Sequence, residues 1–277
     1  MRPTQFSILP MVVKNLLIIN GLCFLANVVL ADRGWFDMND AFGLYYPGSA
    51  NFKPFQLVTH LFMHGSMTHL LFNMFSLWMF GNTLENYWGP KRFLIYYMVT
   101  GLGAAFLHLG VNWYEISHLQ EQVSNYVSNP SYESFRIFIS QNDRNLNIEN
   151  IEKFSQIWFK EKQNPEYIAN SKQIAEQIAE MLVSHKMNVP VVGASGAVFG
   201  LLLGFGMLFP NTELIMLFFP FPIKAKYFVF FYGAAELYQG ISNNPSDNVA
   251  HFAHLGGMLF GFILIKIWNK SNRQHFY

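Results

Sequence analysis

The chain has 277 residues, of which 52% are hydrophobic and only 13% are charged, about half the charged fraction of a typical soluble domain. The formal net charge of +1 gives no electrostatic reason to expect a nucleic-acid partner. The single cysteine, Cys23, excludes an intrachain disulfide. This composition is typical of a protein embedded in a lipid bilayer.

The first apolar segment follows a short stretch that lacks the basic region and small-residue cleavage site of a signal peptide. We therefore expect this segment to be retained as a membrane anchor. A spanning helix needs about 20 apolar residues. Six segments approach that length, and they predict an all-α polytopic membrane protein with a six-helix transmembrane bundle: 12–31, 66–84, 93–110, 190–209, 225–241 and 250–268.

Three prolines interrupt the apolar stretch between the fourth and fifth segments, namely Pro210, Pro220 and Pro222. Proline lacks a backbone donor and breaks a helix. The stretch from Leu214 to Phe221 is also too short to cross a bilayer. We expect it to form an interfacial connector.

Lysine and arginine in short loops predict the orientation of a polytopic protein, because positive residues stay on the cytoplasmic side. With the N-terminus inside, the short outer loops carry only Arg33 and Lys53. Nine basic residues lie on the inner side: Arg2, Lys14, Lys91, Arg92, Lys224, Lys226, Lys266, Lys270 and Arg273. This asymmetry predicts two cytoplasmic termini, in what we expect to be a bacterial plasma (inner) membrane.

Residues 111–188 break the apolar pattern, because Glu, Gln, Asn, Ser and Lys replace Phe, Leu and Gly. We expect a soluble, extracytoplasmic helical insertion here, between helices 3 and 4 of a membrane core at 1–110 and 189–277. Asn164 is predicted to cap a helix that begins at Pro165. One face of that helix is predicted to pack on its neighbours through Ile168, Ile174, Ala175, Ile178, Met181 and Leu182.

A nucleophile and a base lie inside predicted spanning segments. Ser195 occurs in Gly193-Ala194-Ser195-Gly196, and His254 occurs in Ala253-His254-Leu255-Gly256-Gly257. A polar side chain in hydrocarbon is costly unless it is paired, so an intramembrane pair is a candidate functional site. Both residues are predicted to lie four or five residues into their helices, roughly 6–8 Å below the outer boundary. Ser195 would attack a carbonyl carbon, and His254 would accept its proton.

His69 and Asn73 are four residues apart near the start of the second segment, so they project from one face of a helix. Together with the backbone N–H of Ser195, they are predicted to hold the oxyanion of an acyl-transfer intermediate. No acidic residue stands near His254 in the sequence, which favours a dyad over a triad. Glu236, in the fifth segment, has no obvious partner and is assigned only a structural or gating role.

Small residues recur every four positions in the fourth and sixth segments, which is expected to let these two helices approach closely. Phe199, one turn from Ser195, is expected to stack on the His254 ring. The two stripes of small residues are Gly196, Gly200 and Gly204 in one helix and Ala253, Gly257 and Gly261 in the other.

Each feature also has a purely structural interpretation, since a serine in a glycine-rich membrane helix often packs and polar pairs often join helices. A zinc site is a competing chemistry, because several histidines have suitable spacing: His60, His64, His69, His251 and His254. No carboxylate stands beside these histidines and no His-Glu-x-x-His occurs, so we predict no metal and no cofactor. His60 and His64 are expected in the first outer loop, near the water boundary. The coincidence of Ser195, His254 and the second-segment pair at one depth favours catalysis.

Three motifs resemble those of the rhomboid intramembrane serine proteases. They are His64-Gly65-x-x-x-His69-Leu70-x-Phe72-Asn73-Met74 with the following Gly81 and Glu85, then Gly193-Ala194-Ser195-Gly196, then Ala253-His254-Leu255-Gly256-Gly257. The resemblance covers about 55–110 and 189–268. It implies a six-helix core with Ser195 as nucleophile, His254 as general base, and His69 and Asn73 as oxyanion partners.

The resemblance further implies an endopeptidase that cleaves single-span membrane proteins near the outer face of the bilayer, with the fifth helix and the loop 242–248 as gate and cap. The insertion is a departure from simpler members of the family. A non-catalytic rhomboid-like protein that binds membrane helices is the alternative, although such relatives usually lack the serine or the histidine. A transporter is a third hypothesis, but no repeat of discontinuous helices is apparent.

Overall fold

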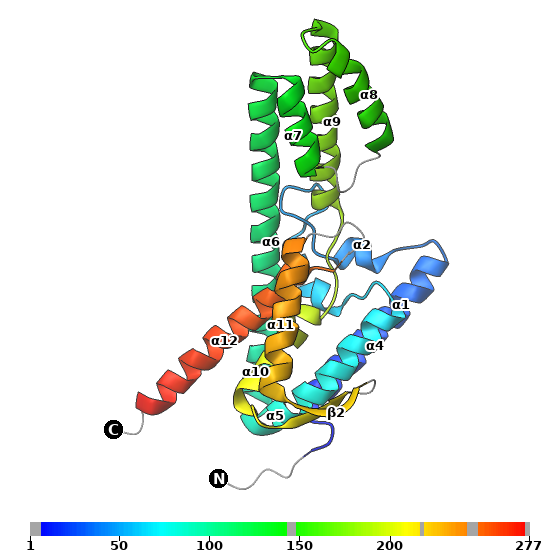
Figure 1. Cartoon of the computed structure of the whole chain (residues 1–277). Coiled ribbons are helices and arrows are strands. Elements are labelled where there is room, and N and C mark those ends of the chain that lie inside the picture. The colour runs from blue at the N-terminus through cyan, green and yellow to red at the C-terminus, as the bar shows by residue number, and fades with distance from the viewer. Residues whose placement is uncertain (1–6, 143–147, 217–218, 243–248, 275–277) are drawn as a thin grey trace. The chain divides into compact units, whose positions relative to one another are not determined.

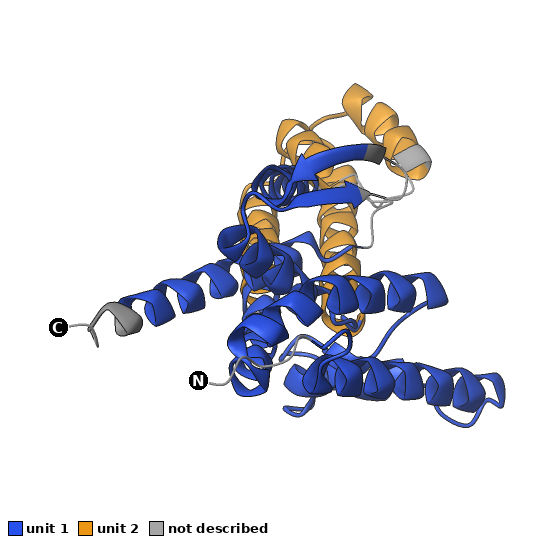
Figure 2. Cartoon of the chain, turned by 90° about the horizontal axis from the view of Figure 1, so that it is seen from below, with its two compact units in different colours: residues 1–109, 190–242, 249–277 blue, residues 110–189, 243–248 orange. Residues whose placement is uncertain are grey.

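The computed structural model describes residues 7–142, 148–216, 219–242 and 249–274. The chain is mostly helical, and its contacts divide it into two compact units (Figure 2). Unit 1 comprises residues 1–109, 190–242 and 249–277, and unit 2 comprises residues 110–189 and 243–248. Every residue predicted for the active site belongs to unit 1.

Helices occupy all six apolar segments of the sequence (Figure 1). They are α1 (Met11–Asp32), α4 (Met67–Ser76) continued by a π-helical turn (Leu77–Gly81) and α5 (Asn82–Trp88), α6 (Pro90–Ser128), α10 (Ser195–Leu208), α11 (Ala225–Ser242) and α12 (His251–Gln274). Among the described residues, three helical stretches are long and apolar enough to cross a membrane, namely α1, α6 and residues 251–270 of α12. Between α1 and α4, short helical turns form α2 (Met38–Phe42), α3 (Gln56–Thr59) and a 3₁₀ turn (His60–Phe62).

A buried carboxylate fixes the start of α1. Glu85 of α5 accepts hydrogen bonds from the backbone N–H groups of Val12 and Val13, at 2.9 and 2.8 Å. The first N–H groups of a helix have no partner within the helix, and a negative charge is favourable at this end. Glu85 therefore ties the first helix to the second helical segment.

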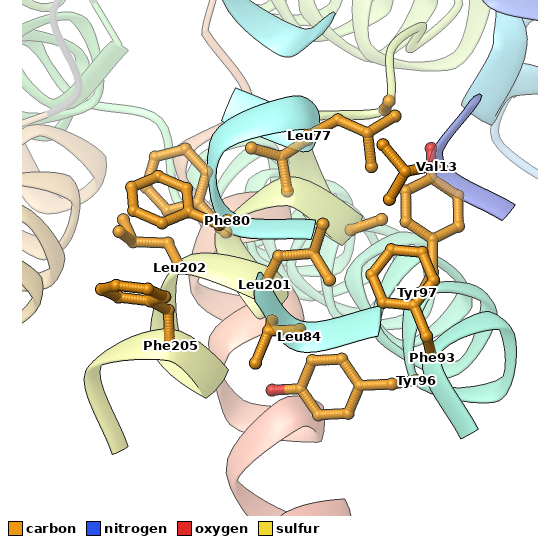
Figure 3. Close-up of a cluster of buried hydrophobic side chains, with 14 of the residues drawn as sticks. Val13, Leu77, Phe80, Leu84, Phe93, Tyr96, Tyr97, Leu201, Leu202 and Phe205 are labelled. Atoms are coloured by element: carbon orange, nitrogen blue, oxygen red, sulfur yellow. The ribbon is translucent and has the colours of Figure 1, made fainter. Parts of the chain in front are cut away.

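α10 is the central helix of unit 1, because 10 of its 14 residues are buried. A helix that is apolar on every side is typical of such a position. The hydroxyl of Tyr96 donates to the carbonyl of Gly200 at 2.8 Å, which joins α6 to α10. Figure 3 shows the surrounding side chains, which come from five elements: Val13, Leu77, Phe80, Leu84, Phe93, Tyr96, Tyr97, Leu201, Leu202 and Phe205.

The outer faces of the unit 1 helices are also apolar. Large exposed hydrophobic side chains include Ile18, Leu22 and Leu25 on α1, Phe230, Phe231 and Ile241 on α11, and Phe262, Ile263 and Ile267 on α12. A water-soluble protein rarely exposes so much apolar surface on consecutive helices. Unit 1 therefore has the surface of an integral membrane protein.

The fourth apolar segment is not helical throughout. Residues 190–194 are non-helical, and α10 begins at Ser195. Pro190 disfavours a helical conformation of Val189, which ends α9 (Pro165–Asn188). Gly193 has a φ of 124°, outside the helical region, which delays the start of α10. Protein partners satisfy this backbone: Val191 pairs with Leu44, and the Gly193 N–H donates to the His60 carbonyl at 2.9 Å. The prediction that Ser195 lies five residues inside its helix is therefore wrong.

The connector between α10 and α11 is a β-hairpin. β1 (Glu213–Met216) pairs antiparallel with β2 (Phe219–Lys224), and Glu213 lies opposite Lys224. The all-α prediction is wrong in this detail, because Ile and Phe favour extended structure where proline prevents a helix. α6 also differs from expectation, since it continues past residue 110 as one helix of 39 residues.

Unit 2 contains the end of α6 together with α7 (Tyr132–Asn142), α8 (Ile148–Lys160) and α9 (Pro165–Asn188). Its own core includes the fully buried Phe135, Trp158 and Ala175. The predicted cap of α9 is confirmed, because the Asn164 side chain accepts from the Glu166 N–H at 3.0 Å. Met181 was predicted to pack on this core, but it is 47% exposed.

Candidate active site

Ser195 and His254 are in direct contact. The Ser195 Oγ lies 2.9 Å from the His254 Nε2. Ser195 is the first residue of α10 and His254 is the fourth residue of α12, so two helix starts bring the pair together. Ser195 is partly exposed, whereas His254 is buried.

A glycine contact allows this approach. A Cβ atom added to Gly257 would overlap the carbonyl oxygen of Gly196, so the two backbones touch next to Ser195 and one turn from His254. Only part of the predicted stripe faces this way. Gly200 faces Thr100 and Gly261 faces Tyr96, both on α6. The prediction that all these glycines join α10 to α12 is therefore wrong, because α6 packs into the same groove.

A carboxylate completes the far side of the histidine. The Glu236 Oε2 lies 2.9 Å from the His254 Nδ1 and 2.7 Å from the His251 Nδ1. Glu236 is buried, and both ring nitrogens donate to it as N–H groups. The prediction that Glu236 has no partner is wrong. The signal in the sequence was the charge itself, since an acidic residue in an apolar helix needs a partner.

Aromatic stacking fixes the plane of the His254 ring. The Phe199 ring lies parallel to it, with centroids 4.1 Å apart and an interplanar angle of 7°. Tyr232 of α11 also stacks on Phe199, with centroids 5.2 Å apart, and Phe228 stacks on Tyr232 at 5.6 Å. This row of rings leaves the imidazole few orientations besides the one that meets Ser195 and Glu236.

His69 and Asn73 lie beside the loop that precedes Ser195. A Cβ atom at Gly193 would lie 2.8 Å from the His69 Nε2 and 3.7 Å from the Asn73 Nδ2, so both side chains border this glycine. Ser66 caps α4 by accepting the His69 N–H at 3.1 Å, which sets where the helix starts. The Asn73 amide nitrogen is buried and has no protein acceptor. An unpaired buried donor is costly and calls for an explanation.

His60 and His64 are buried, at 4% and 1% exposure, rather than near the water boundary as predicted. Burial lowers the pKa of each imidazole to about 4, so both are neutral near pH 7. The His60 Nδ1 donates to the Gln56 carbonyl at 2.8 Å. The His64 ring lies edge-on to that of His69, with centroids 5.1 Å apart. His60 therefore supports the first loop, and His64 supports the His69 ring.

Within the described part of the chain, one group of three side chains has the spacing of metal ligands, and it consists of Glu236, His251 and His254. The predicted alternative of a zinc site that includes His60, His64 or His69 does not assemble there. The proposed cap, residues 242–248, lies outside the described residues except for Ser242.

The fold and the site define a helical membrane protein in which a serine, a histidine and a carboxylate are joined by successive hydrogen bonds inside the helix bundle. A family model of the Rhomboid domain matches residues 51–117 and 167–270. This match covers more than half of the chain and includes every residue of the site. The chain belongs to the rhomboid family. The unmatched residues 118–166 lie in unit 2.

Two relatives carry the same family name. The chain is 40% identical over 58 residues to "Putative rhomboid protease YdcA" of Bacillus subtilis, which covers 21% of this chain and 29% of that protein. It is 26% identical over 121 residues to "Rhomboid protease GlpG" of Haemophilus influenzae, which covers 43% of this chain and 54% of that protein. The chain thus matches less than two thirds of the length of either relative.

Proposed function

We propose that this protein is an intramembrane serine endopeptidase in which Ser195 is the nucleophile, His254 is the general base and Glu236 orients the histidine. The observation that carries the proposal is the unbroken hydrogen-bonded chain from the Ser195 Oγ through both nitrogens of His254 to the Glu236 carboxylate. The names of the two relatives support a protease.

The chemistry follows from the tautomer that Glu236 selects. The His254 Nδ1–H donates to Glu236, so the Nε2 lone pair is free to accept the Ser195 proton. As the Oγ bonds to the scissile carbonyl carbon, its proton moves to Nε2, and the carbonyl oxygen becomes the oxyanion. The resulting imidazolium, stabilised by Glu236, then protonates the departing amine. Water repeats the sequence on the acyl-enzyme and returns the serine.

The oxyanion would be held where two helix starts meet. The Ser195 N–H is at the first position of α10, where backbone donors lack partners within the helix. The buried Asn73 amide, which has no protein acceptor, and the His69 ring border the same loop. The positive ends of α4 and α10 add favourable potential for a developing negative charge.

The six apolar helices would form the membrane core, at 1–110 and 189–277, with residues 111–188 as an extracytoplasmic insertion and both termini cytoplasmic in a bacterial inner membrane. The 14 residues of α10 span only about 21 Å, against about 30 Å of hydrocarbon. With Leu208 at the inner boundary, Ser195 lies roughly 9 Å below the outer one. Single-span membrane proteins would be cleaved at that depth, after local unwinding exposes the peptide bond.

The test is covalent labelling of purified protein with a fluorophosphonate probe, followed by cleavage of a single-span reporter in proteoliposomes. We expect labelling at Ser195, and we expect Ser195→Ala and His254→Ala each to abolish cleavage in folded protein. Cleavage by Ser195→Ala at the wild-type rate would overturn the serine mechanism. Absence of both labelling and cleavage in the wild type would favour the non-catalytic, helix-binding alternative.

A further inference from the structure

Glu236 holds two histidines, and the proposed peptidase chemistry uses only one of them. The nitrogens of His251 and His254 both lie within hydrogen-bond distance of the same carboxylate oxygen. One ligand atom from each of the three residues lies within 4.8 Å of the other two. The three residues are only 7–8% exposed, so the cluster is buried but retains slight access to solvent.

The donor set of this cluster is that of a zinc site. Zn²⁺ prefers imidazole nitrogen and carboxylate oxygen, and two histidines with one glutamate are a known set of three protein ligands that leaves one position for water. Ca²⁺ and Mg²⁺ prefer oxygen ligands and are poor candidates. The chemistry of the cluster therefore selects a transition-series divalent cation.

The geometry needs only small adjustments. Because both Nδ1 atoms point at one oxygen, their directions converge on a common point. The two rings are nearly perpendicular, at 86°, so they approach that point from different sides. In a tetrahedral site, donor atoms lie about 3.3 Å apart, whereas the nitrogen–oxygen distances here are 2.7 and 2.9 Å. Withdrawal of the flexible Glu236 carboxylate would make room for the ion.

We propose that Glu236, His251 and His254 form a reversible Zn²⁺ site whose occupation switches off the general base. The inhibitory consequence rests on the proposed peptidase function, whereas the binding itself does not. When zinc takes the Nδ1 lone pair of His254, the proton on that atom moves to Nε2, and the ring stays neutral. Nε2 then carries a hydrogen and donates to the Ser195 Oγ, so it cannot accept the serine proton. His251 makes the same tautomeric change, and water fills the fourth position.

Zinc binding is tested on an inactive protein, which separates it from catalysis. Full-length Ser195→Ala protein without a histidine tag is titrated with Zn²⁺ against a chromophoric chelator in detergent micelles. We expect one zinc per chain and a rise in melting temperature with zinc. His251→Gln keeps an N–H donor for Glu236 but removes a ligand. Loss of a residue that only hydrogen-bonds a metal ligand typically weakens metal affinity by about 10–100-fold. Because His251 is itself a ligand in the proposed site, His251→Gln should weaken zinc affinity by more than that.

His185→Ala is the matched control, because it removes an exposed histidine of α9 and should leave the zinc affinity unchanged. His251→Ala gives a second variant of the same ligand if the glutamine variant does not fold. Absence of stoichiometric binding, or equal affinity in the folded His251 variants, would overturn the proposal.

Activity is measured separately on the wild type. Zn²⁺ should inhibit cleavage, EDTA should restore it, and Mg²⁺ should have no effect. A wild type that binds zinc but cleaves nothing without it would contradict the peptidase function and leave the metal site standing. A wild type that cleaves equally well with the site loaded would overturn the switch.

Discussion

At the scale of single residues, two buried glutamates each accept two N–H hydrogen bonds but have different roles. Glu85 accepts two backbone N–H groups at the start of α1, whereas Glu236 accepts two imidazole N–H groups from α12. Each carboxylate uses its charge to organise two donors, as a buried charge must. Glu85 thereby fixes a helix end, and Glu236 fixes a tautomer.

The role of Glu236 predicts a loss of turnover without a loss of binding. Glu236→Gln keeps an acceptor oxygen but not the charge that stabilises the imidazolium, and Glu236→Leu removes both. We expect kcat to fall in that order, by up to about 10⁴ for Glu236→Leu as in soluble serine proteases. KM should change little, because the carboxylate does not reach the substrate. The measurements are steady-state kinetics and the rate of fluorophosphonate labelling of Ser195.

Glu85→Gln is the matched control for Glu236. It should lower the melting temperature, because a charged cap is weakened, and leave the kcat of folded protein near the wild-type value. A Glu236→Leu enzyme with wild-type kcat would show that this carboxylate only anchors α11.

Asn73 predicts a second kinetic effect. Its unpaired amide should bond to substrate only when the oxyanion develops, so Asn73→Ala should lower kcat by about 10²–10³ and leave KM nearly unchanged. Asn20→Ala removes another buried amide, which donates to the Leu16 carbonyl of its own helix, and should affect stability alone. Equal kcat values in the two variants would assign Asn73 to packing.

Residue types alone sufficed to nominate Ser195, His254, His69 and Asn73, because polar groups stand out in apolar segments. Glu236 could be seen but not connected, since 18 residues separate it from His254. Side-chain contacts across helices depend on rotation and register, which one sequence does not specify. The same limit explains why His60 and His64 were expected at the water boundary rather than in the interior.

At the scale of elements, apolar runs located the helices well, whereas their ends followed local backbone chemistry. α10 begins five residues later than its apolar segment, where Gly193 takes a φ of 124°. The hairpin before α11 was missed because proline spacing indicates only that a helix is absent. The pairing of helices was predicted only in part. Small residues indicate that another helix approaches closely, but they do not identify which helix it is.

The close contact between α10 and α12 predicts that a single methyl group added at Gly257 lowers both stability and activity. Gly257→Ala would place a Cβ on the Gly196 carbonyl oxygen, so the helices must separate. We expect a destabilisation of about 1–3 kcal/mol and a loss of activity of about 10²-fold from misplacement of the catalytic pair. Gly21→Ala, on α1, meets no atom within 4 Å and should be silent. Thermal unfolding and reporter cleavage measure both effects, and a fully active Gly257→Ala would refute the contact.

At the scale of the whole molecule, the change of composition near residue 110 corresponds to a division of the chain into two units, each with its own hydrophobic core. Composition cannot show that one helix, α6, belongs to both. The side of the membrane on which unit 2 lies stays a prediction from the basic residues of the short loops.

That topology is tested by cysteine accessibility in a Cys23→Ala background. Gln156→Cys, at an exposed position of α8, should react with an impermeant thiol reagent added to intact cells. Lys91→Cys, at an exposed position in the first turn of α6, should react only after the membrane is opened. The reverse pattern would invert the topology and place the Ser195 end of α10 on the cytoplasmic side.

None of the described residues of unit 2 belongs to the catalytic cluster, so removal of residues 115–186 should spare the chemistry. Glu115 of α6 and Lys186 of α9 form an ion pair at 2.6 Å, so the helices through which the chain enters and leaves unit 2 lie side by side at this point. A Gly/Ser linker of about eight residues, which spans roughly 15 Å, can therefore replace residues 115–186. We expect this variant to label at Ser195 and to cleave a small generic reporter at near the wild-type rate. Preference among natural membrane substrates should change, because the insertion would shape access from the outer side. Loss of Ser195 labelling in a folded variant would show instead that unit 2 holds the active site together.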